Sequence, residues 1–123
     1  SCMIAQVVEM EKIVEQGLLY DFYGELLTAH QRSVYEDVVF NDLSPSEIAR
    51  EKGISRQGIH DLIRRCDKIL EDYEAKLHLV AKFVKIRETV EEIQRQADEY
   101  IETRDMDRIE TIRRLSGEIT STL

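Results

Sequence analysis

Residues 44–65 have the sequence SPSEIAREKGISRQGIHDLIRR, and this stretch decides the fold. Ser44 can cap a helix that begins at Pro45, because proline suits the first helical position. Glu47, three residues after the cap, can bond back to the backbone amide of Ser44 and complete a capping box. The stretch therefore predicts a helix that starts at Pro45.

Small and apolar residues in the same stretch have the spacing of a helix-turn-helix. Gly53 suits the left-handed residue that ends the first helix, and Ser55 can cap the second. Ala49 is small where the two helices are expected to cross. The residues expected in the core of the motif are Ile48, Ala49, Ile54, Ile59 and Leu62. This pattern predicts a helix-turn-helix over residues 44–65.

Outside the motif, apolar residues recur at the three- and four-residue steps of amphipathic helices. Before the motif, the pattern predicts a helix over about residues 7–27, kinked near Gly17 or Gly24, and then a helix capped by Thr28 that stops at Asn41.

After the motif, the pattern predicts that the second helix runs beyond residue 75, that the stripe changes phase near Phe83, and that a last short helix ends near Gly117. The chain is thus expected to be all-α, a helix-turn-helix bundle with long amphipathic C-terminal helices. We expect an N-terminal extension at residues 1–9, either disordered or of cloning origin, a helix-turn-helix domain at 10–70, and C-terminal amphipathic helices at 71–123, suited to interaction or dimerisation.

Composition excludes several classes of protein. Seventeen basic and 25 acidic side chains give a net charge of −8. The chain has too many charges and too short apolar runs for a membrane span. Two cysteines and the lack of a signal peptide predict a reducing, cytoplasmic setting. Catalytic, metal and cofactor sites are not expected, because no catalytic motif is present and the histidines lack partners at ligand spacing.

The second helix of the motif carries the candidate nucleic-acid-binding residues. Its first turns, placed in a major groove, would present side chains that suit base edges and phosphates. These residues are Ser55, Arg56, Gln57, His60, Asp61 and Arg64, with Arg65 at a flank. Arginine and glutamine match guanine and adenine edges, and Ser55 with the first amides of the helix can hold a phosphate.

Charge by segment limits this hypothesis. Residues 44–70 carry six basic and four acidic groups, whereas residues 1–43 have a net charge of −6 and residues 71–123 one of −4. A local charge of +2 is small for neutralising several phosphates, so binding by a monomer should be modest and salt-dependent.

A homodimer through the C-terminal stripe is a further hypothesis. The apolar positions expected at a dimer or partner interface are Tyr73, Leu77, Val80, Val84, Val90 and Ile93. A two-fold pairing would present two recognition helices and double the basic patch.

Several ordered segments resemble the bacterial YlxM family. They are residues 20–23, 26–28, 31–32, 43–49, 54–57 and 67–77, and the resemblance as a whole covers roughly residues 10–79. This family consists of helix-turn-helix proteins similar to region 4 of sigma factors. The chain departs from the family pattern at Gly58, where alanine is common, and at His60, where tyrosine is usual.

The resemblance implies an all-α protein that acts in or regulates the signal recognition particle pathway, and we expect it to be non-enzymatic because no catalytic motif is present. Its partner would be the particle or its GTPase. The acidic charge favours such a basic partner. The alternative is a DNA-binding transcriptional regulator that uses the helix-turn-helix.

Overall fold

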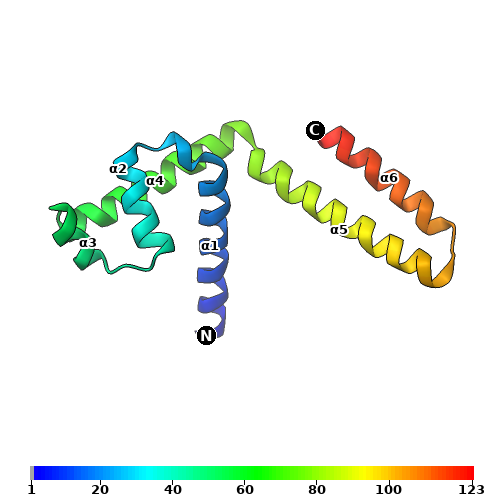
Figure 1. The fold of residues 1–123 in the computed structure, drawn as a ribbon, viewed down its shortest axis with the longest axis horizontal. Helices are drawn as coiled ribbons and strands as arrows, with labels where there is room; N and C mark the ends of the chain where they lie inside the picture. The colour runs from blue at the N-terminus through cyan, green and yellow to red at the C-terminus, as the bar shows by residue number, and fades with distance from the viewer. Residues whose placement is uncertain (1) are drawn as a thin grey trace. The chain divides into compact units, whose positions relative to one another are not determined.

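The structure, a computed structural model, describes the backbone of residues 2–123 and the side chains of residues 11–123. These residues form helices and no strand, which confirms the all-α class. The chain divides into two compact units, one ending at Leu77 and one running from His78 to Leu123 (Figure 1). Residues 71–77, expected to belong with the C-terminal helices, instead continue a helix of the first unit. For the extension expected at residues 1–9, the side chains lie outside the described residues.

The first unit begins with α1 (Cys2–Tyr23) and a short 3-10 helix, η1 (Gly24–Leu26). The predicted irregularity falls at Gly24, where the α-helix stops. Gly24 is buried, and a Cβ atom there would lie 2.9 Å from the ring of Tyr20. The close approach of the Tyr20 ring therefore requires glycine at this position.

The second helix is capped by Thr28, as predicted. Helix α2 (Ala29–Tyr35) is followed by a π-helix, η2 (Glu36–Phe40), and the chain leaves the helical path at Asn41. Thr28 Oγ1 accepts a hydrogen bond from the amide of Gln31 at 3.2 Å, and Gln31 Oε1 accepts one from the amide of Thr28 at 3.0 Å. Both ends of the predicted segment are thus confirmed, and the cap is a full capping box.

The helix-turn-helix consists of α3 (Pro45–Lys52) and α4 (Arg56–Leu77). Gly53 has a φ of 68°, so the predicted left-handed turn is confirmed. One detail of the prediction is wrong. Ser44 Oγ accepts from the amide of Ser46 at 3.2 Å, one residue before the amide that a capping box with Glu47 would use. Ser44 therefore caps α3 through its hydroxyl alone, and the predicted bond from the Ser44 amide to the Glu47 carboxylate is not formed.

The core of the first unit lies where α1, α2 and α3 contact α4. It contains the predicted Ile48, Ile59 and Leu62, whereas Ala49 and Ile54 are only half-buried. Among residues 11–77, the other buried apolar side chains are Leu19, Tyr23, Leu27, Val34, Tyr35, Cys66 and Leu70. Cys66 is a core residue, as its place on the apolar stripe predicted.

The second unit is an antiparallel hairpin of α5 (Leu79–Thr103) and α6 (Asp107–Thr122) (Figure 1). The break before α5 is at His78, which has a φ of 56°, earlier than the phase change predicted near Phe83. A left-handed histidine has no local sequence signal, so spacing alone misplaced the break. Helix α6 also continues to Thr122 rather than ending near Gly117, because regular backbone bonding continues through a glycine with open space around it.

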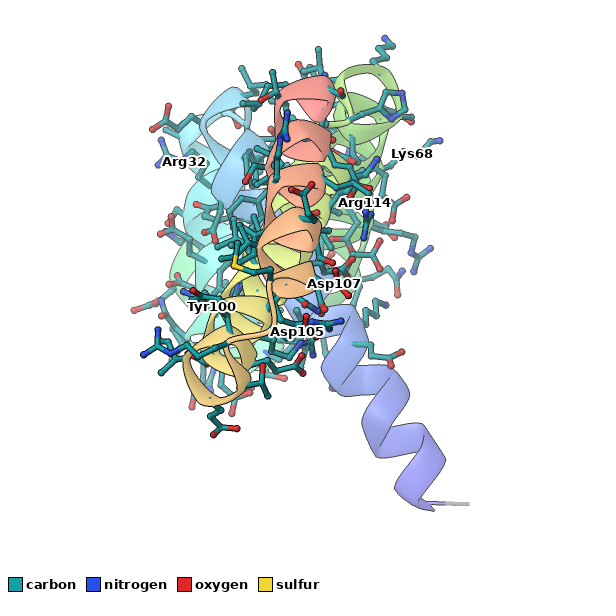
Figure 2. The ribbon with its side chains drawn as sticks, turned by 90° about the vertical axis from the view of Figure 1, so that its right-hand side faces the viewer. Arg32, Lys68, Tyr100, Asp105, Asp107 and Arg114 are labelled. Atoms are coloured by element: carbon teal, nitrogen blue, oxygen red, sulfur yellow. The ribbon has the colours of Figure 1, made fainter. Side chains whose placement is uncertain are left out.

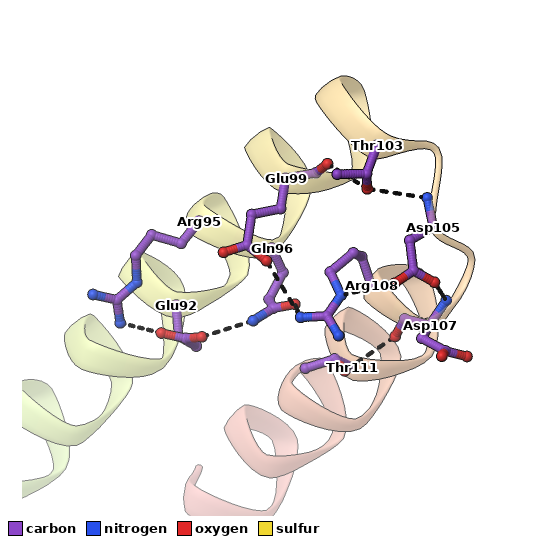
Figure 3. A network of polar contacts seen from close by, with 9 residues as sticks. All are labelled: Glu92, Arg95, Gln96, Glu99, Thr103, Asp105, Asp107, Arg108 and Thr111. Atoms are coloured by element: carbon purple, nitrogen blue, oxygen red, sulfur yellow. Dashed lines mark hydrogen bonds and ion pairs between the residues drawn. The ribbon is translucent and has the colours of Figure 1, made fainter.

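A polar network joins α5 and α6 near their turn (Figure 3). Gln96 is one of the buried side chains of the hairpin; its amide donates to Glu92 at 2.9 Å and its carbonyl accepts from Arg108 at 3.1 Å. Arg108 also lies 3.3 Å from a carboxylate oxygen of Glu99. The network satisfies the buried amide and fixes the register of the two helices.

Candidate nucleic-acid interface

The candidate interface is the face of α4 that points away from the core. All seven predicted nucleic-acid-binding side chains are exposed. They are Ser55, Arg56, Gln57, His60, Asp61, Arg64 and Arg65. Ile59, Leu62 and Cys66 occupy the opposite face and are buried, so one stretch of α4 carries both the core and the exposed set. The structure therefore leaves all seven predicted side chains open to solvent along the cap and first three turns of α4, with Asp61, Arg64 and Arg65 lining one hollow.

The start of α4 is held by its cap. Ser55 Oγ accepts a hydrogen bond from the amide of Gly58 at 2.9 Å, and the backbone carbonyl of Ser55 accepts one from Ile59. The hydroxyl proton of Ser55 can still be donated to an acceptor such as a phosphate oxygen. A Cβ atom on Gly58 would lie 2.8 Å from Cγ2 of Ile54, so the turn packs closely at this glycine.

Gln57 is oriented by its own helix. Its amide nitrogen donates to a carboxylate oxygen of Asp61 at 3.1 Å, one turn further along. A glutamine amide has two N–H donors and one carbonyl acceptor, so one donor and the acceptor remain for a ligand. The Asp61 carboxylate thus orients the Gln57 amide, and we assign it no phosphate contact.

A basic flank follows on the next turns of α4. Gly58, Asp61, Arg64, Arg65 and Lys68 line an open hollow on the surface. Lys68 also pairs with Asp72 at 3.1 Å, both side chains being mostly exposed. Among the described residues, Arg64 and Arg65 form no ion pair. Sequence reasoning missed Lys68, although its place one turn after Arg64 on the same face could have indicated it.

One acidic side chain of this segment does not contribute to the surface. Asp67 turns inward, where one carboxylate oxygen accepts from the hydroxyl of Tyr35 at 2.6 Å and Gln16 donates to both oxygens at 3.0 and 3.1 Å. Burial and the bond to Asp67 raise the pKa of the Tyr35 hydroxyl. Turning this carboxylate inward leaves the outer surface of the motif more basic than its formal +2.

The predicted dimer or partner positions are divided between the two units. Tyr73 and Leu77 lie on α4, whereas Val80, Val84, Val90 and Ile93 lie on α5. The ring of Tyr73 stacks on Tyr23 of α1 with centroids 6.0 Å apart, so it contributes to the packing of the first unit. Leu77 is 48% exposed and Val90 40% exposed.

Two general findings limit the classes of site. Of the helices described, none is both long and apolar enough to cross a membrane. Within the same residues, histidine, cysteine and carboxylate side chains do not gather into a group that could hold a metal ion.

The fold and this surface define a helix-turn-helix protein. The chain belongs to the UPF0122 family, whose model, described as "Putative helix-turn-helix protein, YlxM / p13 like", matches residues 10–110. The resemblance to the YlxM family is thereby confirmed. The resemblance seen in the sequence reaches only to about residue 79. The family model continues beyond it and includes the hairpin turn and the start of α6.

Curated relatives agree with this assignment. A UPF0122 protein of Streptococcus gordonii is 43% identical over 86 residues, which cover 70% of this chain and 78% of the relative. The UPF0122 protein YofM of Lactococcus lactis subsp. lactis is 39% identical over 99 residues, which cover 79% and 89%. The chain therefore spans most of the length of these relatives.

Proposed function

We propose that this protein is a DNA-binding regulatory protein that places the first half of α4 in a major groove. The single observation that carries the proposal is the exposure of all seven candidate side chains at the cap and first three turns of α4, while Ile59 and Leu62 of the same turns are buried. A helix-turn-helix uses this part of its second helix to contact bases.

The first turn of α4 would provide the base contacts. Arg56 can bond both acceptors of a guanine edge, and Gln57 can bond the N7 and N6 positions of adenine. Because Asp61 accepts from only one N–H of Gln57, the other N–H and the carbonyl oxygen are available to an adenine edge. We therefore assign sequence discrimination to Arg56 and Gln57.

The later turns would contact phosphates. Arg64, Arg65 and Lys68 line the hollow at the flank, and contacts of this kind orient a protein on duplex DNA without reading its sequence. With few cations available, affinity should fall steeply with salt.

Selection of genomic DNA fragments on the purified protein tests this proposal. We expect an enriched sequence, with one adenine position that becomes less selective in the Gln57→Ala variant. A good bidentate contact contributes about 1–3 kcal/mol of discrimination, or roughly tenfold to a hundredfold. Gln94→Ala on the exposed surface of α5 is the matched control. If no sequence is enriched and binding disappears near physiological salt, the proposal is wrong.

A second candidate function is favoured by the charge of the whole chain. The net charge of −8 suits a basic protein or ribonucleoprotein partner, and opposite charge speeds association. Together with the YlxM resemblance, this supports a cytoplasmic, non-enzymatic regulator of the signal recognition particle or its GTPase. Purified particle protein, mixed with this chain at physiological salt, should bind it and change its rate of GTP hydrolysis. Neither binding nor a changed rate would contradict this second function.

A further inference from the structure

The hairpin of α5 and α6 has a very small core. Among the described residues of 78–123, only Gln96 and Leu115 are less than a tenth exposed. A pair of helices with one buried apolar side chain gains little free energy from burial. The hairpin therefore needs a further apolar surface.

Helix α5 carries an apolar stripe that the hairpin leaves partly exposed. Its positions recur at three- and four-residue steps and so share one face of the helix. The α5 stripe consists of Ile86, Val90, Ile93, Ala97 and Ile101. Val90 is 40% exposed and Ile101 63% exposed, while the other three are half-buried.

Charges are segregated along the hairpin. The open half, residues 78–90 and 113–123, has five basic and two acidic groups and a net charge of +3. The turn half, residues 91–112, has three basic and eight acidic groups and a net charge of −5. Figure 2 shows Asp105 and Asp107 at the turn, with Arg114 further along α6 toward the other end.

Three of the five basic side chains of the open half gather at one place. Lys82, Lys85 and Arg114 line a single open hollow between α5 and α6, together with Ala81, Gly117, Glu118, Ser121 and Thr122. Arg114 is 3.0 Å from Glu118, which neutralises only one of the three cations. The open half thus has a local excess of positive charge.

We propose that the α5 stripe binds the same stripe of a second copy of this chain in an antiparallel arrangement. A two-fold interface uses the same patch on both copies, and when its axis is perpendicular to the helices each half of one hairpin meets the opposite half of its partner. An antiparallel pair brings +3 against −5 at both ends, whereas a parallel pair brings like charges together. The product is a four-helix bundle that carries two copies of α4. This inference does not depend on DNA binding.

The apolar part of the interface is tested by the mass of the full chain in solution without nucleic acid. Over a concentration series, light scattering should give the mass of two chains, and Val90→Glu should shift the dissociation constant upward at least about a hundredfold, since a charge buried at the stripe is left unpaired. The matched control is Ile13→Glu on α1, 54% exposed, which should leave the dimer intact. Circular dichroism confirms that both variants remain folded.

The direction of pairing is tested by charge reversal. Lys82→Glu with Lys85→Glu makes both halves acidic and should weaken self-association about tenfold or more. Asp98→Lys with Glu102→Lys should also weaken it, and a mixture of the two variants should regain the dimer. In a parallel pair the two open halves face each other. Lys82→Glu with Lys85→Glu would then replace a contact between positive charges by one between negative charges and leave the dissociation constant unchanged.

Three results would overturn the inference. They are the mass of one chain at every concentration, a dimer that Val90→Glu leaves unchanged, and a dimer that the lysine reversals leave unchanged. Because no DNA is present, failure here is distinct from failure of the DNA-binding proposal.

Discussion

At the scale of single residues, Asp67 lies at the border between the buried and the exposed face of α4. Its neighbours along the helix differ sharply, since Cys66 is fully buried and Lys68 is exposed. The Asp67 carboxylate accepts bonds from Tyr35 of α2 and Gln16 of α1, and so ties both helices to α4. A charge placed this way holds the helix that carries the candidate interface, while it adds no negative charge to that surface.

Removing the Tyr35 hydroxyl should destabilise the first unit. Tyr35→Phe keeps the ring but removes a hydrogen bond to a carboxylate, and should lower the free energy of unfolding by about 1.5–3 kcal/mol. Urea denaturation measures the difference. Tyr73→Phe is the matched control, because its ring stacks on Tyr23 and the expected loss is within about 0.5 kcal/mol. Equal losses in the two variants would show that the Tyr35–Asp67 bond has no special role.

Burial should make the Cys66 thiol unreactive. Titration of this thiol should also change the free energy of unfolding with pH. Burial, followed by the negative charge of Asp67, raises the pKa of this thiol from 9.0 to about 11. The folded state then keeps a proton that the unfolded state releases, so stability is complete below pH 9 and falls as the pH rises toward 11. In a Cys2→Ser background, a thiol reagent should react slowly until denaturant is added.

The slope of the free energy of unfolding against pH also tests whether the Cys66 thiol is buried. Between pH 9 and 11 it should be shallower in Cys66→Ala than in the parent chain. Rapid labelling of the native protein at pH 8 would contradict the burial of the thiol.

At the scale of elements, the chain ends its helices with residues that have left-handed backbone. Gly53 ends α3 with a φ of 68°, His78 separates α4 from α5 with a φ of 56°, and Arg104 ends α5 with a φ of 58°. The glycine has this conformation at little cost, whereas the other two residues must be held there by their surroundings.

Two glycine substitutions in the first unit should have opposite signs. Gly53→Ala should destabilise by about 1–2 kcal/mol, because an L side chain is strained at a positive φ. Gly17→Ala lies inside α1 with open space around it and should stabilise by up to about 1 kcal/mol. Thermal melts of both variants measure the difference. The account of the turn would be contradicted if Gly53→Ala were neutral.

The predictable elements are those whose ends have a local chemical signal. Thr28, Pro45 and Gly53 fixed three boundaries correctly, because caps, ring geometry and φ are properties of a few neighbouring residues. His78 and the last turn of α6 were misplaced because neither has such a signal. The π-helix at Glu36–Phe40 was missed for the same reason.

Only part of the candidate interface could be predicted from the sequence, for the same reason. The seven exposed side chains followed from helical spacing around Ile59 and Leu62. The supports from Gln16 and Tyr35 could not be found, because 51 and 32 residues separate them from Asp67 and only tertiary packing brings them together.

At the scale of the whole molecule, net charge and local charge point to different partners. The chain has a charge of −8, yet the exposed surface of α4 presents Arg56 at its start and Arg64, Arg65 and Lys68 around one hollow further along. Charges separated by more than about 10 Å are largely screened at ordinary salt, so a phosphate at α4 experiences mainly the local cations. The surrounding acidity should lower the affinity without removing the site.

DNA binding by α4 is tested most directly by the salt dependence of binding to a selected DNA duplex. Arg64→Ala should weaken binding and lower the slope of log affinity against log salt by about 0.9 per bound chain, the loss of one phosphate contact. Lys12→Ala on α1 removes the same charge from an exposed site and should leave the slope unchanged. Equal slopes for the parent chain, Arg64→Ala and Lys12→Ala would contradict the claim that α4 binds DNA.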